Sequence, residues 1–232
     1  NLKREYAFTS HILLFEACPE QYRFFKELEF HPVRAGAQIF GTLVHQTIED
    51  IHKAVLRKEG HLVSHEQIQN WLNTNYIYLS KKERQFLAPN TLKAIERHVV
   101  NYYDREKRQL DRLQEAEVEI SLVKDQYILK GSIDLIRGEN GTVEIIDFKS
   151  ERKPDLEKEK TRFETYQRQL QLYAHLLEEK TGQTVSRMHL YYTGETEGSP
   201  YVSFEKKTDQ IERTVKQFDQ VVARIEAKDY GM

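Results

Sequence analysis

Residues 127–150 read YILKGSIDLIRGENGTVEIIDFKS, and the central part of the predicted fold follows from them. Apolar residues alternate with other residues on both sides of Asn140-Gly141. Asn-Gly between two such runs is the strongest short-range indication of a two-residue β-turn. The stretch therefore predicts a β-hairpin, with strands over residues 127–137 and 142–150.

Two aspartates face one another across this hairpin. If Asn140 and Gly141 are the central residues of a type I′ turn, Gly138 pairs with Val143 and Asp134 pairs with Asp147. Opposed side chains have Cβ atoms about 5 Å apart, and like charges there are destabilising unless a cation lies between them. Because Mg²⁺ prefers a few carboxylate oxygens plus waters and phosphates, the pair predicts a divalent metal site at the open end of the sheet.

A lysine shares the face of the second aspartate. Strand alternation puts Asp147 and Lys149 on one side of the second strand and Phe148 on the other. A metal held by Asp147 can polarise a phosphodiester, while the Lys149 ammonium can orient a water or stabilise developing negative charge. The alternative is a hairpin whose charges are simply solvated at its open end.

The elements around the hairpin follow from periodicity. Before it, aromatic residues and leucines at mixed spacing predict a first helix within residues 6–26, capped by Thr9 or Ser10. From residue 37, apolar residues recur at the three- and four-residue intervals of an amphipathic helix. Alternation from Glu115 predicts one more strand, and the glycine at position 182 predicts the end of a helix. The remaining expected elements are helices over residues 37–58, 65–79, 89–113, 163–180 and 208–227, and strands over residues 185–193 and 201–205.

These elements predict an α/β fold. We expect a central mixed β-sheet with an antiparallel three-strand meander, flanked by helices and preceded by a helical layer. One domain spans residues 1–232: a mainly helical part (1–113), a catalytic α/β core (114–206) and a closing helix (207–232). Because the sequence begins at Asn1 and its only methionines are Met188 and Met232, we expect a piece of a longer protein.

Composition narrows the function classes. The single cysteine, Cys18, excludes an internal disulfide and a metal site built from several cysteines of this chain. No apolar run approaches the ~20 residues that a bilayer requires, and no signal peptide is evident, so we expect no membrane partner and a cytoplasmic location. The net charge of −2 gives no basic indication of DNA binding. However, carboxylates around a metal lower the formal charge without making the surface acidic.

Four segments in a fixed order resemble the motifs of the RecB-type branch of the PD-(D/E)XK nuclease superfamily. They are Gly41-Thr-Leu-Val-His45, Gly131-Ser-Ile-Asp134, Glu144-Ile-Ile-Asp147-Phe-Lys149-Ser150 and Tyr166-Gln-Arg-Gln169-Leu-Gln-Leu-Tyr173-Ala. The resemblance spans residues 41–173. It implies a restriction-endonuclease-like core and hydrolysis of DNA with Mg²⁺ or Mn²⁺.

The resemblance also implies roles for single residues. His45, Asp134 and Asp147 would bind the metal together with the Phe148 carbonyl, and Lys149 would act in catalysis beside the two aspartates. Gln169, Tyr173 and Tyr166 would position the site and the DNA. For Tyr173 a core role is as well supported as DNA contact.

The sequence does not decide the roles of three further groups of residues. Glu117 is a candidate for supporting the metal ligands, although the register of its strand is ambiguous at the loop of residues 124–126. Glu49 and His52 are expected in solvent or beside the ligands. Cys18-Pro-Glu-Gln-Tyr22 is similar to the start of the iron–sulfur variant found in AddB-type and CRISPR-associated relatives. Either three more cysteines lie outside this chain, or Cys18 is a small buried apolar residue.

The leading expectation is a DNA exonuclease domain attached to a helicase in a repair or recombination enzyme, the helicase being implied by the resemblance alone. One alternative is a CRISPR-associated spacer-trimming nuclease with the same chemistry. Another is an inactive module that binds DNA or supports a partner subunit.

Overall fold

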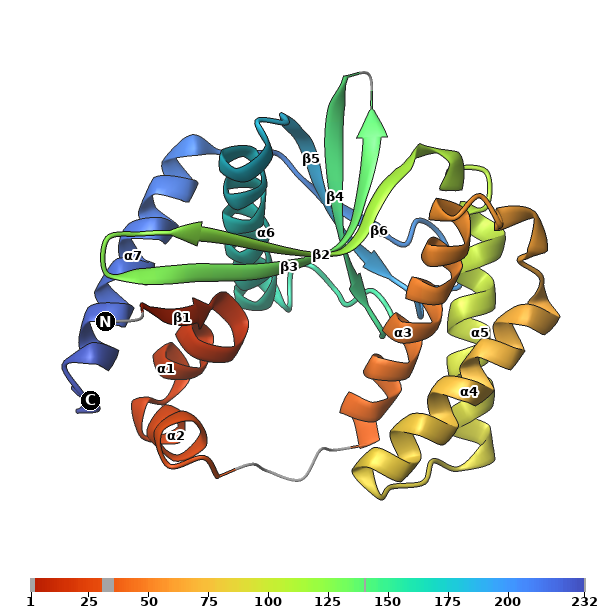
Figure 1. Cartoon of the computed structure of the whole chain (residues 1–232), viewed down its shortest axis with the longest axis horizontal. Coiled ribbons are helices and arrows are strands. Elements are labelled where there is room, and N and C mark those ends of the chain that lie inside the picture. The colour runs from red at the N-terminus through yellow and green to blue at the C-terminus, as the bar shows by residue number, and fades with distance from the viewer. Residues whose placement is uncertain (1–2, 31–35, 140, 232) are drawn as a thin grey trace.

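The computed structural model describes residues 3–30, 36–139 and 141–231, and it has helices on both faces of one mixed β-sheet (Figure 1). Six strands form the sheet in this part of the chain. The predicted α/β class with a central mixed sheet is confirmed. The main order is β1 (Arg4–Ala7), β3 (Tyr127–Glu139), β4 (Thr142–Lys149), β5 (Val185–Tyr192) and β6 (Tyr201–Phe204), and β2 (Leu113–Val123) pairs with β3.

The predicted antiparallel meander is formed by β2, β3 and β4. Gly138 pairs with Val143, as the turn prediction requires, and the ladder continues to Leu135 and Ile146. Asn140 lies outside the described residues, whereas Gly141 has the positive φ (82°) that favours glycine in such a turn. The next pair in this register is Asp134 with Asp147, just beyond the last paired residues.

The N-terminal segment differs from the prediction. Arg4–Ala7 is a strand, parallel to β3, with Tyr6 beside Leu129. The helical segments that follow are short, and the first begins after Ala7 without a side-chain cap, so the predicted cap at Thr9 or Ser10 was wrong. These segments are a π-helix (Phe8–Leu13), α1 (Leu14–Ala17), α2 (Pro19–Tyr22) and a second π-helix (Arg23–Glu27).

The longer helices form two layers (Figure 1). One layer consists of α3 (Gly36–Leu56), α4 (His65–Glu83) and α5 (Pro89–Glu106), with 3₁₀ turns at Gly60–Leu62 and Leu110–Arg112. The other contains α6 (Lys160–Thr181) and α7 (Thr208–Glu226). The α6 helix ends at Gly182 with φ 73°, as predicted. The α5 helix is shorter than predicted, because the chain enters β2 at Leu113.

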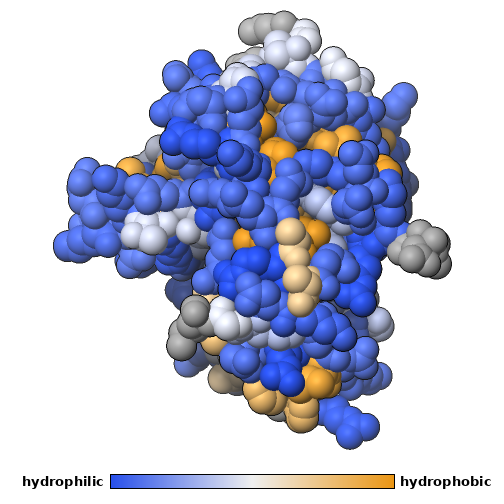
Figure 2. Space-filling model, turned by 90° about the vertical axis from the view of Figure 1, so that its left-hand side faces the viewer, coloured by the Kyte–Doolittle hydropathy of each residue, from blue (hydrophilic) through white to orange (hydrophobic). Residues whose placement is uncertain are grey.

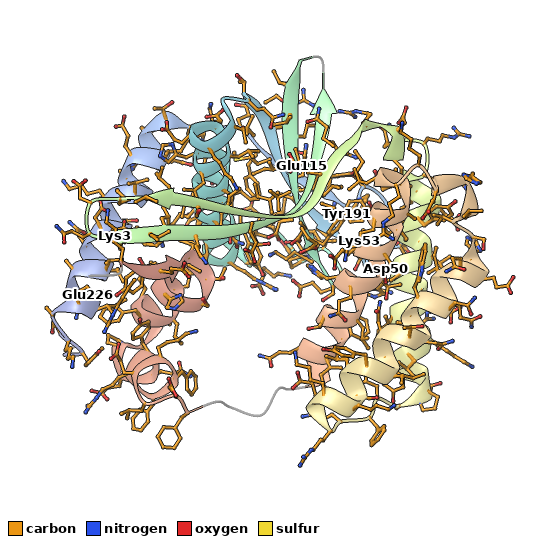
Figure 3. All side chains as sticks on the ribbon, in the orientation of Figure 1. Lys3, Asp50, Lys53, Glu115, Tyr191 and Glu226 are labelled. Atoms are coloured by element: carbon orange, nitrogen blue, oxygen red, sulfur yellow. The ribbon has the colours of Figure 1, made fainter. Side chains whose placement is uncertain are left out.

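Each helical layer packs on its own hydrophobic core. Apolar side chains on the two faces of β4 contribute to both cores. Val143 and Ile145 pack into the core under α6 and α7, whereas Ile146 and Phe148 pack into the core under α3 and α5. Tyr191, labelled in Figure 3, lies in this second core. Its ring meets that of Phe148 edge-on. Burying such a side chain contributes about 1.5–3 kcal/mol, so the sheet is fixed from both faces.

The face that carries the N-terminal segment and α7 is mostly hydrophilic, with small groups of apolar residues between the polar ones (Figure 2). Phe24, Leu28 and Phe30, which follow α2, are each about half exposed or more. In the part of the chain that is described, no helix has the length and apolar character needed to cross a bilayer.

Candidate active site

The candidate site lies where β3 changes its partner. Along one edge, β3 pairs with β1 as far as Lys130 and with β4 from Leu135 onward, so residues 131–134 lie in a gap between these two strands. Ile133 and Leu135 pack into different cores, although residues two apart in a regular strand share a face. The strand therefore turns at Asp134 and presents this residue at the gap.

Tyr173 of α6 fills the first part of the gap. A Cβ atom on Gly131 would lie 2.6 Å from Cε1 of Tyr173, so only glycine allows the ring to pack there. The Tyr173 hydroxyl accepts a hydrogen bond from Nε2 of Gln169 (3.2 Å), and the side chain is buried. Of the two roles left open by the sequence, this packing supports the core role.

Asp134 is held by the neighbouring strand and by α3. Its Oδ2 accepts a hydrogen bond from the backbone N–H of Phe148 (2.7 Å) and lies 3.6 Å from Nδ1 of His45. His45 reaches the aspartate because α3 approaches the end of β4 closely. A Cβ atom on Gly41 would lie 3.0 Å from Oγ of Ser150, which explains the glycine one turn before the histidine.

Asp147 is oriented by β4 and α6. Its Oδ2 forms an ion pair with Nζ of Lys149, and its Oδ1 accepts a hydrogen bond from Nε2 of Gln169 (3.3 Å). Nζ of Lys149 also lies 4.2 Å from the centre of the Tyr166 ring. The predicted shared face of Asp147 and Lys149 is confirmed, and α6 supplies the groups that fix both.

A third carboxylate, Glu117 of β2, lies opposite Asp134. The register of β2 with β3 is settled by the pairs Ala116–Leu135 and Val118–Ile133, which flank these two residues. Glu117 has a φ of 51°, a left-handed conformation that costs about 1–3 kcal/mol for a residue with a side chain. Such strain persists only where the surroundings enforce it, and it is common at functional sites.

The negative charges of the carboxylates in this site have too few positive partners nearby. Burial and the charge of Asp147 raise the pKa of Asp134 to about 6. Burial and the charge of Asp134 raise the pKa of Glu117 to about 8. Burial opposes the charge of Lys149, but Asp147 outweighs it and raises the lysine pKa above its usual value. Lys149 therefore stays protonated, while the remaining negative charge favours a bound cation.

The donor set fits a hard divalent cation. Ligand atoms of His45, Glu117 and Asp134 all lie within 4.8 Å of one another. Oxygen donors with a single imidazole suit Mg²⁺ or Mn²⁺ better than a thiophilic metal. Asp147 and Phe148, also predicted as ligands, line the same cleft as His45 and Asp134. The sequence predicted Glu117 only as a supporting residue, because the register of β2 that places it beside Asp134 comes from tertiary structure.

Two candidate residues lie elsewhere. His52 is buried, its Nε2 lies 2.6 Å from the Tyr102 hydroxyl and its ring stacks on that of Phe148, so the expectation that it lies in solvent was wrong. Cys18 is partly exposed, and its sulfur accepts a hydrogen bond from the Gln21 N–H (3.4 Å) at the start of α2. Its role as an iron–sulfur ligand stays a prediction.

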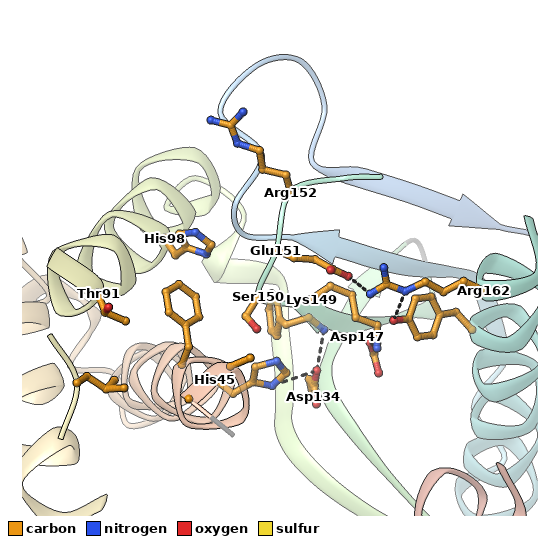
Figure 4. Close-up of a pocket in the computed structure, with 16 residues that line it drawn as sticks. His45, Thr91, His98, Asp134, Asp147, Lys149, Ser150, Glu151, Arg152 and Arg162 are labelled. Atoms are coloured by element: carbon orange, nitrogen blue, oxygen red, sulfur yellow. Dashed lines mark hydrogen bonds and ion pairs between the residues drawn. The ribbon is translucent and has the colours of Figure 1, made fainter. Parts of the chain in front are cut away.

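The acidic cluster opens into a cleft of about 890 Å³. His98 and Thr91 lie on one side and Arg162 on the other, with His45, Asp134 and Lys149 between them (Figure 4). The sequence reasoning missed Arg162, although it precedes Tyr166 by one helical turn and Gln169 by two. That spacing was the available indication of a shared face on α6.

The sequence of this chain matches the model of one known protein family. The model of the PD-(D/E)XK nuclease superfamily matches residues 9–232. A crystal structure of a candidate exonuclease from Eubacterium rectale is similar over 91% of this chain and 75% of that one, with a TM-score of 0.57 and 11% identity. At that identity the likeness supports the fold alone. The crystal structure of the protein SSO0001 matches 91% of this chain and 85% of that one at 15% identity, and its TM-score of 0.39 adds nothing to the assignment. No curated protein matches the chain.

Proposed function

The chain belongs to the PD-(D/E)XK nuclease superfamily, and from this premise we propose that it is a divalent-metal-dependent deoxyribonuclease, more specifically an exonuclease. The observation that carries the proposal is the convergence of Asp134, Asp147 and Lys149 at the gap in β3. An inactive module of the same fold would have no need to keep these three groups together in an open cleft. The choice of an exonuclease rests on the resemblance of the four motifs to RecB-type enzymes.

The metal would be held by His45, Glu117, Asp134 and Asp147, with the Phe148 carbonyl as a further donor. Mg²⁺ or Mn²⁺ bound there would polarise the phosphodiester and lower the pKa of a coordinated water. Glu117, which the sequence suggested as a supporting residue, is proposed as a direct ligand because its carboxylate lies within the cluster.

Lys149 supplies the fixed positive charge of the reaction. Its Nζ is held between the Asp147 carboxylate and the face of Tyr166, and the raised pKa keeps it protonated. A protonated amine at this position stabilises charge that develops on the phosphate oxygens. It can also hold a water by hydrogen bonding, in line with the scissile phosphate.

Gln169 and Tyr166 act as positioning residues in this proposal. Gln169 bonds both Asp147 and the Tyr173 hydroxyl, so it links the ligand to the side chain that fills the gap. Tyr166 supports Lys149 and accepts a hydrogen bond from Nε of Arg162 (3.0 Å). Tyr166 lines the cleft and can contact DNA, whereas Tyr173 is buried.

The biological setting rests on the resemblance to RecB-type enzymes. It supports a role in DNA repair or recombination with a helicase as a partner domain or subunit. A spacer-trimming nuclease would use the same site, and helicase motifs in the parent protein would separate the two.

A direct test incubates the domain with labelled single- and double-stranded DNA in Mg²⁺, Mn²⁺ or EDTA. We expect cleavage with either metal, none in EDTA, and release of short products from the ends. A circular substrate resists an exonuclease, so its cleavage would show endonuclease action instead. No cleavage of any DNA with either metal would refute the proposed function.

A further inference from the structure

The backbone that carries Lys149 is held by two residues that follow β5. The pairing of β4 with β5 ends at Lys149. Thr193 then donates twice to the Lys149 carbonyl, from its backbone N–H (2.9 Å) and from its hydroxyl (3.3 Å). The Gly194 N–H donates to the Glu151 carbonyl (3.0 Å). The backbone on both sides of Ser150 is therefore fixed after the strand has ended.

Gly194 comes too close to this segment to carry a side chain. A Cβ atom there would lie 2.7 Å from the backbone carbonyl carbon of Glu151 and 2.8 Å from Cε1 of His98. Thr193, beside it, is buried. The His98 ring is itself held by the Phe40 ring, which it meets edge-on at 5.0 Å. The residues after β5 are thus packed between the end of β4 and α5.

His98 of α5 extends these hydrogen bonds into a chain. Its Nδ1 lies 2.9 Å from the hydroxyl oxygen of Thr193. Burial and the charge of Arg97 lower the pKa of His98 to about 4, so the ring is neutral at neutral pH. Because the Thr193 hydroxyl uses its proton to donate to the Lys149 carbonyl, His98 has to donate from Nδ1. The chain runs from His98 through Thr193 to the Lys149 backbone.

The segment held in this way carries one cation of the cleft and anchors another (Figure 4). Lys149 reaches the Asp147 carboxylate from it, and the Glu151 carboxylate pairs with the Arg162 guanidinium. The Thr193 hydroxyl bonds the carbonyl of Lys149 and not its ammonium. Thr193 therefore acts on the lysine through the position of the backbone.

We infer that His98 and Thr193 are positioning residues of the proposed nuclease, which set the place of Lys149 by holding its backbone carbonyl. The inference rests on the proposed function and adds two residues to those that the reaction needs. Neither residue belongs to the four sequence motifs. A displacement of a catalytic group by about 1 Å can lower a rate by about 10²-fold, so the effect should appear in the cleavage rate.

The test measures single-turnover cleavage of a labelled DNA in Mn²⁺ at rising enzyme concentration, which separates the maximal rate from DNA affinity. Thr193→Val keeps the side-chain shape without the hydroxyl. It should lower the maximal rate about tenfold or more and change the half-saturating concentration by less than about twofold. Calorimetric titration should give the wild-type affinity for Mn²⁺. Thr193→Ser should recover most of the rate, and Thr196→Val, at an exposed position of the same loop, is the matched control.

The histidine should act as part of the same unit. His98→Leu should lower the maximal rate as Thr193→Val does, and the double variant should lose no more than either alone. His98→Asn, whose amide can donate from nearly the same place as Nδ1, should recover most of the rate. On a Lys149→Ala background, Thr193→Val should cause no further loss, because the group that it positions is gone.

A wild-type rate for Thr193→Val would overturn the inference and leave the nuclease proposal standing. So would an undiminished effect of Thr193→Val on the Lys149→Ala background, or a loss of Mn²⁺ affinity that matches the loss of rate. Circular dichroism checks each variant, and if Thr193→Val does not fold, the comparison of His98→Leu with His98→Asn decides. Absence of cleavage by the wild-type protein on every DNA would instead refute the proposed function.

Discussion

Strands β3 and β4 carry two clusters of charged side chains, one buried and one partly buried, three residues apart along each strand. The two clusters differ in how many positive partners their carboxylates have. In the first, Arg137 pairs with Glu106 (3.1 Å) and with Glu144 (3.3 Å). Glu144 also lies 3.4 Å from Nε2 of His189. We call these residues the Arg137 cluster. The second, the Asp134 cluster, consists of His45, Glu117, Asp134, Asp147 and Lys149.

The pKa values of the carboxylates separate the two clusters. Burial raises the pKa of Glu144, but the charges of Arg137 and His189 outweigh it and the net shift is downward. The pKa values of Asp134 and Glu117 are instead raised by burial and by neighbouring carboxylates. A buried acid with cationic partners is a structural element, whereas clustered acids without enough cations are typical of a functional site.

The largest expected effect concerns the Arg137 cluster. Arg137→Ala should lower the free energy of unfolding by about 3–5 kcal/mol, because it leaves two buried carboxylates without their main cation. Urea unfolding measures the loss, and Arg213→Ala, which removes an exposed ion pair, should change stability by less than about 1 kcal/mol. A stability loss at Arg137 as small as that of the control would contradict the assigned difference.

The next effect concerns catalysis in the Asp134 cluster. Lys149→Ala should lower the cleavage rate by about 10²–10³-fold while metal binding and DNA binding persist, because the lysine acts on the transition state. Asp147→Ala should lose metal affinity as well, which calorimetric titration with Mn²⁺ would detect. Lys158→Ala, at an exposed position, is the control. Equal loss of metal affinity in the Lys149 and Asp147 variants would show that their roles are wrongly assigned.

A smaller effect concerns pH. Because the folded-state pKa of Glu117 is raised to about 8, the native state holds a proton that the unfolded state has released above the ordinary value of 4.5. In EDTA, this group should lower the free energy of unfolding as pH rises through that window, by about 1–2 kcal/mol. Glu144, with its lowered pKa, has the opposite sign: its contribution is lost on acidification below its usual range.

Glu117→Gln tests the pH effect. Urea unfolding of wild type and variant in EDTA, at about pH 5 and about pH 9, gives the difference. The variant should gain stability relative to wild type at the higher pH. An identical pH dependence of the two proteins would mean that Glu117 is solvated in the folded state.

The hairpin was predictable because its determinants are local. The Asn-Gly pair in the sequence predicted the register, and alternation placed Asp147, Phe148 and Lys149 on the correct faces. The predicted register no longer gives the contacts of Asp134, because β3 leaves β4 and turns at this residue. Contact of Asp134 with the Phe148 N–H depends on that irregularity.

The features that the sequence did not predict depend on contacts between residues far apart along the chain. The Arg4–Ala7 strand is only four residues long, and its partner on β3 lies more than 120 positions away. His52 was expected in solvent or beside the ligands, because nothing local indicates that α5 covers it through Tyr102. Glu117 enters the site through a positive φ, which a glutamate rarely adopts and which no sequence pattern predicts.

We propose that the Asp134 cluster binds a divalent cation, and the Asp134→Asn variant tests this proposal in a single comparison. The substitution keeps the side-chain shape and removes one of the clustered charges. In EDTA the variant should melt slightly higher than wild type, by the equivalent of about 0.2–1 kcal/mol, because like-charge repulsion is relieved. In saturating Mg²⁺ the order should reverse, since only wild type gains stability from tight metal binding. Thermal melts in both conditions reveal this crossing. Equal stabilisation of both proteins by Mg²⁺ would contradict the metal site, and a lower melting temperature of the variant in both conditions would show that Asp134 serves the fold through its hydrogen bond to Phe148.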